Sequence, residues 1–326
     1  MRHSRTLILI GVLIILALPV AAAPVLAKDH ASAERDRIAA YWTKERIANA
    51  RPRDFVKAAG GNFVPTRGKP GGGGALNVIG ASWAKDGQVV TTTGKVLFTL
   101  NTGDYICTGT VVTDQTNDRS IVISAAHCAW DGADGGFARN WTFIPEFDTT
   151  PTYTCSQAKW GCWMASALVV NRGFTSAGGF NDQAVQYDWS FAVVTAAGTK
   201  GGTLDSSVGS FALDTNTMAV NDQVYDFGYP AAGKYHGSDL IYCADQIFTD
   251  AGTGNATFGI DCDMTGGSSG GPWLKPFSEA NGIGSIRAVN SYGYSGVKKE
   301  YASKFNTNTA NTFSAAKTVL TNTIVN

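Results

Sequence analysis

The sequence predicts an all-β protein, and three features of residues 78–326 indicate this class. Short segments rich in β-branched and aromatic residues recur along this part of the chain, and Gly, Asn and Asp turns bound them. Charged residues make up only 16% of the chain, and the 38 glycines supply many turn positions. No repeat of fixed period occurs. We therefore expect a sandwich or barrel of short antiparallel strands.

The expected strands are short and come before a single helical pattern near the C-terminus. That pattern covers residues 309–324 and places Phe313, Ala316, Val319 and Leu320 on one face. The strands are expected within residues 88–100, 104–112, 119–127, 141–147, 166–171, 189–196, 223–230, 240–248 and 285–293.

The first 27 residues have the pattern of a signal peptide. Arg2 and Arg5 precede a long apolar stretch, and small residues up to Ala27 offer a cleavage site before Lys28. The alternative is an uncleaved anchor, because the apolar run approaches the roughly 20 residues needed to span a bilayer. Pro19 and the alanine-rich end favour cleavage. We expect a secreted, extracellular protein.

Residues 28–77 have the composition of a propeptide. A helical pattern comes first, and Pro52 ends or kinks it. The segment "TRGKPGGGG" (66–74) follows as a flexible basic linker that proteases can reach. The alternative is an ordinary helical appendage of the mature protein. The apolar residues of the helical pattern are Ile38, Tyr41, Trp42, Ile47 and Phe55.

Charge is distributed unevenly along the chain. Residues 1–77 hold 12 Lys and Arg against 5 Asp and Glu, a balance of +7, whereas residues 78–326 hold 14 against 21, a balance of −7. An acidic body argues against nucleic acid as a partner, because a phosphate-binding surface needs the opposite sign. The difference suits a basic leader that docks on the body it precedes.

All six cysteines lie in the body, and export allows them to form disulfides. Six cysteines allow 15 pairings, so the sequence alone leaves their connectivity open. Neither C-x-x-C nor a Cys/His ligand spacing occurs, and we expect neither a metal nor a cofactor.

Two adjacent serines in "CDMTGGSSGGPWL", Ser268 and Ser269, each lie in a G-x-S-x-G frame. No histidine follows them, which excludes the chain order of an α/β-hydrolase. His127 lies upstream in "SIVISAAHCAWD", where an apolar strand ends in small residues that leave room for a substrate. A histidine in a surface loop is the plain alternative, but a bridge between Cys107 and Cys128 would fix His127 against the sheet.

The motifs "CTGTVV", "SAAHC" and "GGSSGGP" together resemble those of chymotrypsin-like (trypsin-fold) serine peptidases, within them the V8-like glutamyl endopeptidase branch. The resemblance covers roughly Val78–Ile324. It implies two six-stranded antiparallel β-barrels, at residues 78–200 and 201–326, with the active site between them and a C-terminal helix. It also implies Ser269 as the nucleophile, His127 as the base, and the N–H groups of Gly267 and Ser269 as the oxyanion hole.

The third member of the triad is expected to be Asp188. It opens the apolar strand of "QYDWSFAVV", whose aromatic residues would shield the carboxylate that orients the imidazole. Asp182 and Asp226 are the alternatives. Ser268 occupies the place of the aspartate that receives the new N-terminus in trypsin-type zymogens, so activation must proceed differently. Of the remaining cysteines, we expect Cys155–Cys162 to close a short loop and Cys243–Cys262 to tie two strands of the second barrel.

The S1 pocket is expected along two segments, the residues before the serines and the strand "VNSYG". Asp263 matches the spacing of the aspartate that selects Arg or Lys in trypsin-like enzymes, but V8-like enzymes also carry aspartate there. The histidine that helps hold a substrate carboxylate in those enzymes is replaced by Asn290. We expect an acidic P1 residue, with Arg/Lys and broad specificity as alternatives. The expected substrate-binding residues are Asp263, Thr265, Asn290, Ser291 and Gly293.

These features predict a monomeric secreted serine endopeptidase that acts on proteins or peptides by acyl transfer, with its own propeptide as a partner. Two alternatives are a catalytically inert binding protein with a protease fold and a secreted esterase on the same scaffold. The intact His/Asp/Ser set argues against the first.

Overall fold

The computed structural model describes residues 23–65, 78–116, 119–133, 135–147 and 154–326, with side chains from residue 31 onward. Most of the expected signal peptide and the glycine-rich linker therefore lie outside the described residues. Within the described part, none of the helices combines the length and apolar character needed to cross a bilayer.

The first barrel is a closed ring of six strands. Its order is β6-β5-β10-β11-β12-β7, and pairing of β6 with β7 closes it. The residues that point inward are large and fully buried, Phe98, Phe143 and Trp163 among them. The strands are β5 (Thr93–Leu100), β6 (Gly103–Val112), β7 (Ser120–Ser124), β10 (Arg139–Pro145), β11 (Trp163–Asn171) and β12 (Ser190–Val194).

The second barrel is a curled sheet of six main strands in the order β17-β20-β19-β18-β14-β15. The Cys243–Cys262 disulfide joins β15 to the residue that follows β17, across the open seam of the sheet. The two barrels confirm the expected fold class. The strands are β14 (Gln223–Gly228), β15 (Ile241–Gln246), β17 (Thr257–Asp261), β18 (Pro272–Ser278), β19 (Ile283–Tyr294) and β20 (Lys299–Ser303), with β4 (Val78–Ser82), β13 (Ala212–Leu213) and β16 (Phe248–Thr249) added at their sides.

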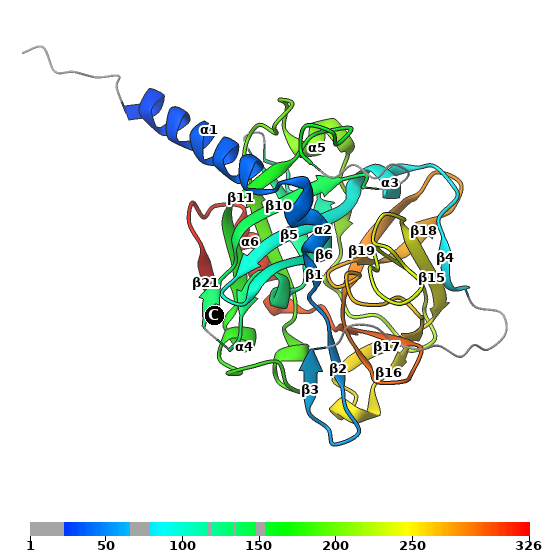
Figure 1. Ribbon diagram of the computed structural model, residues 1–326. Coiled ribbons are helices and arrows are strands. Elements are labelled where there is room, and N and C mark those ends of the chain that lie inside the picture. The colour runs from blue at the N-terminus through cyan, green and yellow to red at the C-terminus, as the bar shows by residue number, and fades with distance from the viewer. Residues whose placement is uncertain (1–22, 66–77, 117–118, 134, 148–153) are drawn as a thin grey trace, which may run out of the picture.

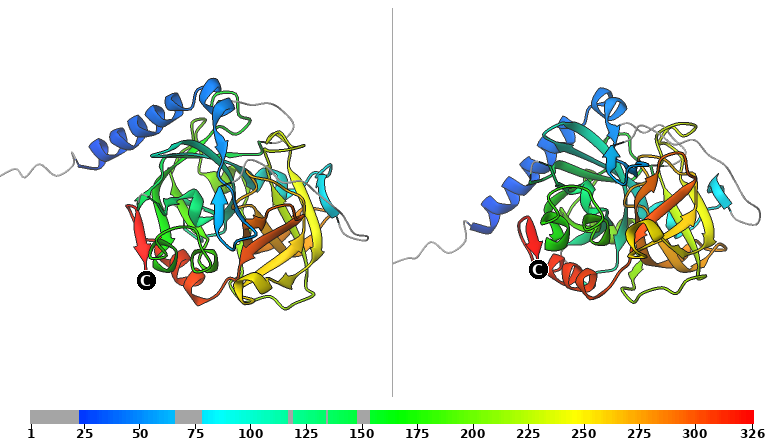
Figure 2. Two further views of the ribbon diagram at one scale, coloured as in Figure 1. Left: turned by 60° about the horizontal axis from the view of Figure 1, so that its bottom comes forward. Right: turned by 90° about the horizontal axis from the view of Figure 1, so that it is seen from below.

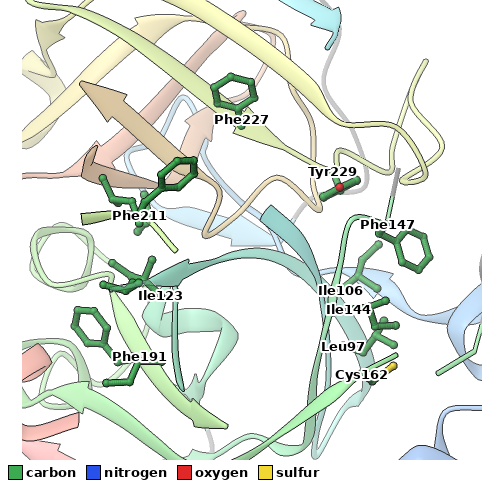
Figure 3. Packing of buried hydrophobic residues seen from close by; sticks show 14 of the residues in the cluster. Leu97, Ile106, Ile123, Ile144, Phe147, Cys162, Phe191, Phe211, Phe227 and Tyr229 are labelled. Carbon is green, nitrogen blue, oxygen red and sulfur yellow. The ribbon is translucent and has the colours of Figure 1, made fainter. Parts of the chain in front are cut away.

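One apolar cluster runs through both barrels and fixes their relative position. Ile123 and Phe191 reach it from the first barrel, and Phe227 and Tyr229 from the second (Figure 3). All four side chains are fully buried. Burying such side chains stabilises the fold by roughly 1.5–3 kcal/mol each, so the cleft between the barrels has rigid walls.

Two local expectations from the sequence are wrong. Residues 88–92 form the short helix α3 (Gln88–Thr92) before β5, where a strand was expected throughout. The C-terminal helix α6 (Thr307–Ala316) is shorter than the expected 309–324, and Leu320 is 78% exposed. The chain beyond α6 instead adds β21 (Thr323–Val325) parallel to β11, because the sheet edge offers backbone partners that a longer helix would forgo.

The leader begins with two helices, α1 (Ala23–Tyr41) and α2 (Lys44–Asn49), and α1 extends away from the barrels (Figures 1 and 2). The expected helical pattern included Phe55, with Pro52 as the point where the helix ends or kinks, and the chain becomes extended after α2. Pro52 lacks the N–H that a helix needs, and the residue before proline disfavours helical geometry. Three short strands follow, β1 (Arg51–Pro52), β2 (Phe55–Lys57) and β3 (Phe63–Pro65).

The leader is attached to both barrels. Strand β1 pairs in parallel with β6 of the first barrel, and β2 pairs in parallel with β19 of the second, so the segment crosses from one to the other (Figure 1). Earlier in the leader, Trp42 is 1% exposed and donates from Nε1 to the carbonyl of Asn140. Tyr41 and Arg46 both bind the carboxylate of Asp104. The basic leader thus docks on the acidic body.

Candidate active site

His127 and Asp188 are brought together by the pairing of two neighbouring strands. His127 lies in a short 3₁₀ turn, η1 (Ala126–Cys128), directly after β7, and Asp188 lies directly before β12. Because β7 and β12 are antiparallel, with Ser124 opposite Ser190, the end of one strand meets the start of the other. Asp188 Oδ1 accepts from the backbone N–H of His127 at 2.9 Å, and Oδ2 lies 2.7 Å from Nδ1.

The carboxylate of Asp188 is fully buried and receives a third hydrogen bond from the second barrel. Ser291 Oγ donates to Asp188 Oδ2 at 2.6 Å. The two alternative acids are placed differently, since Asp182 has a side chain that is 56% exposed and Asp226 lies in β14 opposite Cys243. Ser291 was expected to donate to substrate, but its hydroxyl is already given to Asp188, so it positions the acid instead.

The serine turn lies between β17 and β18 and is held by Thr108 of β6. The Thr108 N–H donates to the Ser269 carbonyl, and its hydroxyl donates to the Gly267 carbonyl, both at 2.8 Å. Gly267 has a φ of +106°, and a Cβ there would meet the Tyr229 carbonyl at 2.7 Å. Only glycine fits this position. Thr108 belongs to the "CTGTVV" motif, but the sequence did not show that it supports the serine turn.

Ser268 and Ser269 differ in their surroundings. Ser268 Oγ donates to the Thr265 carbonyl at 2.9 Å, so it is a structural part of the turn. Ser269 Oγ is buried, and no hydrogen-bond partner for it lies among the described residues. A buried hydroxyl without a partner is unfavourable, and a catalytic role is one reason for which such a group is kept. The two serines therefore differ in hydrogen bonding, and Ser269 as the nucleophile remains a prediction.

His127 Nε2 is in contact with the leader. It lies 3.0 Å from the backbone carbonyl of Arg53. A carbonyl only accepts, so this contact needs a proton on Nε2, whereas a general base needs that nitrogen free to take one. The leader therefore occupies the ring nitrogen of His127 that faces away from Asp188.

Phe55 of the leader covers the same histidine. Its ring meets the His127 ring edge-on at a centroid distance of 5.5 Å and stacks on Phe180 at 4.0 Å. Phe55 is 7% exposed, and Arg53 forms an ion pair with Asp131 next to it. With the leader in this position, His127 is only 1% exposed.

The expected S1 residues are close to one another, but most of their polar atoms are already paired. Thr265 Oγ1 donates to the Ala232 carbonyl at 2.9 Å, and Asn290 Oδ1 accepts from Trp273 Nε1 at 2.6 Å. Gly293 is the strand partner of Val56 in the leader.

Asp263 already has two cationic neighbours, so its carboxylate is not left open for a substrate cation. Tyr235 donates to Oδ1 at 2.5 Å, and the ammonium groups of Lys234 and Lys298 lie 2.9 and 3.5 Å from Oδ2. Burial, followed by the hydrogen bond to Asp263, raises the pKa of Tyr235, so its hydroxyl stays protonated and donates. The sequence pattern did not indicate the two lysines, which come from a loop and from the turn before β20.

Three disulfides form with the expected connectivity, namely Cys107–Cys128, Cys155–Cys162 and Cys243–Cys262. The first links β6, which supports the serine turn, to the residue after His127. This disulfide therefore links the turn that carries His127 covalently to the strand that holds the turn of Ser269.

Similar proteins are found among solved structures. Protease Anisep from Arthrobacter nicotinovorans has 33% sequence identity and a TM-score of 0.61, covering 74% of this chain and 99% of its own. A thermostable serine protease, AL20, from an extremophilic microorganism has 31% identity and a TM-score of 0.60, covering 71% and 98%. A Glu endopeptidase in complex with MPD is 17% identical with a TM-score of 0.54, covering 74% and 97%, and shares the fold alone. No family model matches the sequence, and no curated protein matches it significantly.

The identity to the first two proteins, over nearly their whole length, shows the family. The chain belongs to the serine proteases with the chymotrypsin-like fold.

Proposed function

We propose that the protein is a secreted serine endopeptidase in which Ser269, His127 and Asp188 form the triad. His127 takes the proton of Ser269 as its Oγ attacks the scissile carbonyl, then returns the proton to the leaving amine. Asp188 holds the tautomer in which Nε2 is the base. The observation that carries the proposal is the buried Asp188–His127 pair at 2.7 Å, with a third bond from Ser291.

The N–H groups of Gly267 and Ser269 are proposed as the oxyanion hole. The turn that presents them is fixed by Thr108 on one side and by Asn290 on the other, whose carbonyl accepts from the Gly270 N–H at 2.7 Å. Fixed donors need no reorganisation as negative charge develops on the substrate oxygen. Loss of one such donor lowers transition-state stabilisation by about 2.7–4 kcal/mol.

Residues 28–77 are proposed as an inhibitory propeptide. The contact of the Arg53 carbonyl with His127 Nε2 and the cover by Phe55 support this role. Activity then requires release of the leader, in agreement with Ser268 standing where a trypsin-type zymogen has its aspartate. Disulfides in the body support export, since such bonds persist outside the cytosol.

An acidic P1 residue is proposed, with a different physical basis from the one expected. Lys234 and Lys298 place two positive charges beside the single negative charge of Asp263. Two ammonium groups within 3.5 Å of this carboxylate favour a substrate carboxylate over a substrate cation at this place. This argument disfavours Asp263 as the selector of Arg or Lys.

The proposed activity is tested on the secreted protein after release of the leader. We expect it to react with a fluorophosphonate probe and to digest casein, whereas Ser269→Ala does neither. Labelling without casein digestion but with ester hydrolysis would indicate an esterase. No labelling of a protein whose leader is demonstrably gone would indicate an inert binding protein.

The P1 proposal is tested with peptides that differ only at P1. We expect the highest kcat/KM with Glu or Asp, and a decline when Lys298 is replaced by Met. A preference for Arg or Lys that disappears in Asp263→Asn would contradict the proposal.

A further inference from the structure

Lys57, the last residue of β2, places its ammonium group in a preformed site of the body. The side chain is 6% exposed. Its Nζ donates to Asp182 Oδ1 in a short ion pair and to the Gly252 carbonyl at 2.7 Å. These two acceptors come from different barrels, so the site exists only where the barrels meet. Burying an ammonium without such partners is strongly unfavourable, which makes this a built cation site rather than an incidental contact.

Both acceptors are fixed by body residues and not by the leader. Asp182 lies in the turn before a 3₁₀ segment, η2 (Ala184–Gln186), and its own carbonyl accepts from Gln186 Nε2 at 2.8 Å. Asn181 Oδ1 caps the same turn by accepting from the N–H groups of Gln183 and Ala184 at 3.0 Å. The carboxylate of Asp182 is therefore on a supported turn six residues before Asp188.

The loop that presents the Gly252 carbonyl is held by a buried carboxylate. Asp250 accepts from the Gly252 N–H at 2.9 Å and from the hydroxyls of Tyr292 and Tyr294 at 2.5 and 2.8 Å. Burial, followed by the hydrogen bond to Asp250, raises the pKa of both tyrosines, so they stay protonated and donate. Because every one of these residues lies beyond residue 77, the site remains when the leader leaves.

The site lies along the line that an extended chain follows through the cleft. Arg53 contacts His127, and Lys57 is four residues further along. At about 3.3 Å per residue, four residues of extended backbone span about 13 Å. Strand β2 also pairs with β19 at Gly293 and Tyr294, so β19 accepts an extended peptide beside the cation site.

We propose that Asp182 and Gly252 form a substrate subsite for a basic side chain, Lys or Arg, about four residues from the scissile bond. The leader fills this subsite with Lys57 and thereby uses a recognition element of the enzyme for its own docking. The inference rests on the proposed peptidase function, because it assigns specificity to the same cleft. A carboxylate and a carbonyl are both acceptors, so the site selects cations over neutral and acidic side chains.

The substrate test uses the enzyme that the secreted full chain yields after loss of its leader. Quenched peptides carry either Lys or norleucine at a single position, scanned from two to five residues on each side of the scissile bond. We expect about tenfold higher kcat/KM for Lys near the fourth position on one side. Asp182→Asn should remove this difference in kcat/KM. The control Asp86→Asn makes the same change of charge at an exposed aspartate and should retain the difference. A Lys-to-norleucine ratio near one at every position, or one unchanged by Asp182→Asn, overturns the proposal.

A second measurement separates this proposal from the peptidase function itself. In the full chain carrying Ser269→Ala, the rate of hydrogen exchange at the β2 amides measures release of the leader. Lys57→Met and Asp182→Asn should each speed exchange several-fold, and the double variant should exceed neither by much, because both remove one interaction. Lys44→Met, at an exposed leader lysine, should have little effect. If the double variant instead showed the product of the two single effects on the exchange rate, Lys57 and Asp182 would not form a site, whether or not the enzyme cleaves peptides.

Discussion

The backbone carbonyl of Arg53 lies 3.0 Å from Nε2 of His127, at the nitrogen that a serine nucleophile would need. Asp188 is already in place on the other side of the ring. The residues proposed as acid and base are thus already in contact while the leader is bound, and the proposed block affects only the transfer of the Ser269 proton to His127. We therefore expect release of this segment to free Nε2 of His127 while both barrels keep their structure.

The two adjacent serines should respond differently to replacement by alanine. Ser269→Ala should lower kcat about 10⁶-fold, because the triad acts as a unit. Ser268→Ala removes only the bond to the Thr265 carbonyl, so most activity should remain, with about 1 kcal/mol lost from the free energy of unfolding. Single-turnover kinetics and urea unfolding measure the two effects. Equal loss of activity in both variants would contradict the assignment.

Phe55 should determine how tightly the leader inhibits. Phe55→Ala removes the stacked contact with Phe180 and the edge contact with His127, a loss of about 2 kcal/mol that corresponds to roughly thirtyfold weaker binding. We expect the full-length variant to react faster with a fluorophosphonate probe. Val64→Ala, at a leader residue that is 41% exposed, is the control and should react like the unaltered protein.

The leader should be absent from the active form, and intact-mass measurement of the purified enzyme tests this. Full activity of a protein whose N-terminus is Lys28 would exclude inhibition by the leader.

Ser291→Ala should impair catalysis through Asp188. The variant removes a 2.6 Å hydrogen bond to a buried carboxylate, and such bonds contribute about 1.5–3 kcal/mol. We expect kcat to fall roughly 10–100-fold with KM nearly unchanged, because the triad acid is less well held. A rise in KM at constant kcat would instead assign Ser291 to substrate binding, as the sequence suggested. Ser291→Thr, which keeps the hydroxyl, should recover part of the activity.

Thr108 should support both stability and the oxyanion turn. Its hydroxyl donates to the Gly267 carbonyl and accepts from the Tyr229 N–H at 3.0 Å, and all three groups are buried. Thr108→Val leaves both partners without a bond, so we expect a loss of about 2 kcal/mol in unfolding free energy together with a lower kcat. Thr108→Ser keeps the hydroxyl and should preserve kcat. Equal kcat in Thr108→Val and Thr108→Ser would show that the Thr108 hydroxyl does not support the oxyanion turn.

Lys95 should make stability depend on pH. Burial lowers the pKa of this lysine to about 7, and its Nζ lies 3.9 Å from the centroid of the Phe147 ring. Between pH 7 and about pH 10, the unfolded chain holds a proton that the folded protein has released, so unfolding free energy should rise with pH in this window. The slope is at most about 1.4 kcal/mol per pH unit.

Urea unfolding of Ser269→Ala, which avoids self-digestion, measures this dependence. Lys95→Met should flatten it between pH 7 and 9 and should raise stability at pH 6, where the folded protein otherwise carries a buried charge. An unchanged slope in Lys95→Met would show that other groups cause the dependence.

Local patterns in the sequence determined most of the strands and the all-β class, whereas the two barrels and the residues of the proposed triad followed from the resemblance of three motifs to a known family. Alternation and turn residues act over a few positions, and the motifs around His127 and Ser269 place each group on its own strand end or turn. The spacing of the six cysteines left their pairing open, and the three pairs expected once the family was recognised are the pairs found. The expected end of the C-terminal helix was wrong, because a sheet edge offered backbone partners that periodicity cannot register. The helical pattern of the leader did not show that Phe55 would lie in a strand paired with β19.

Only the tertiary structure decided which polar atoms meet across the barrels. Ser291 looked like a pocket donor, yet the fold points its hydroxyl at Asp188, 103 positions away in sequence. Asp263 looked like a cation selector, yet Lys234 and Lys298 reach it from separate loops. Lys57 gave no local signal at all, since its partners come from two different barrels. Hydrogen bonds and ion pairs act over a few ångströms, so their partners are fixed by packing between distant segments and not by the neighbours along the chain.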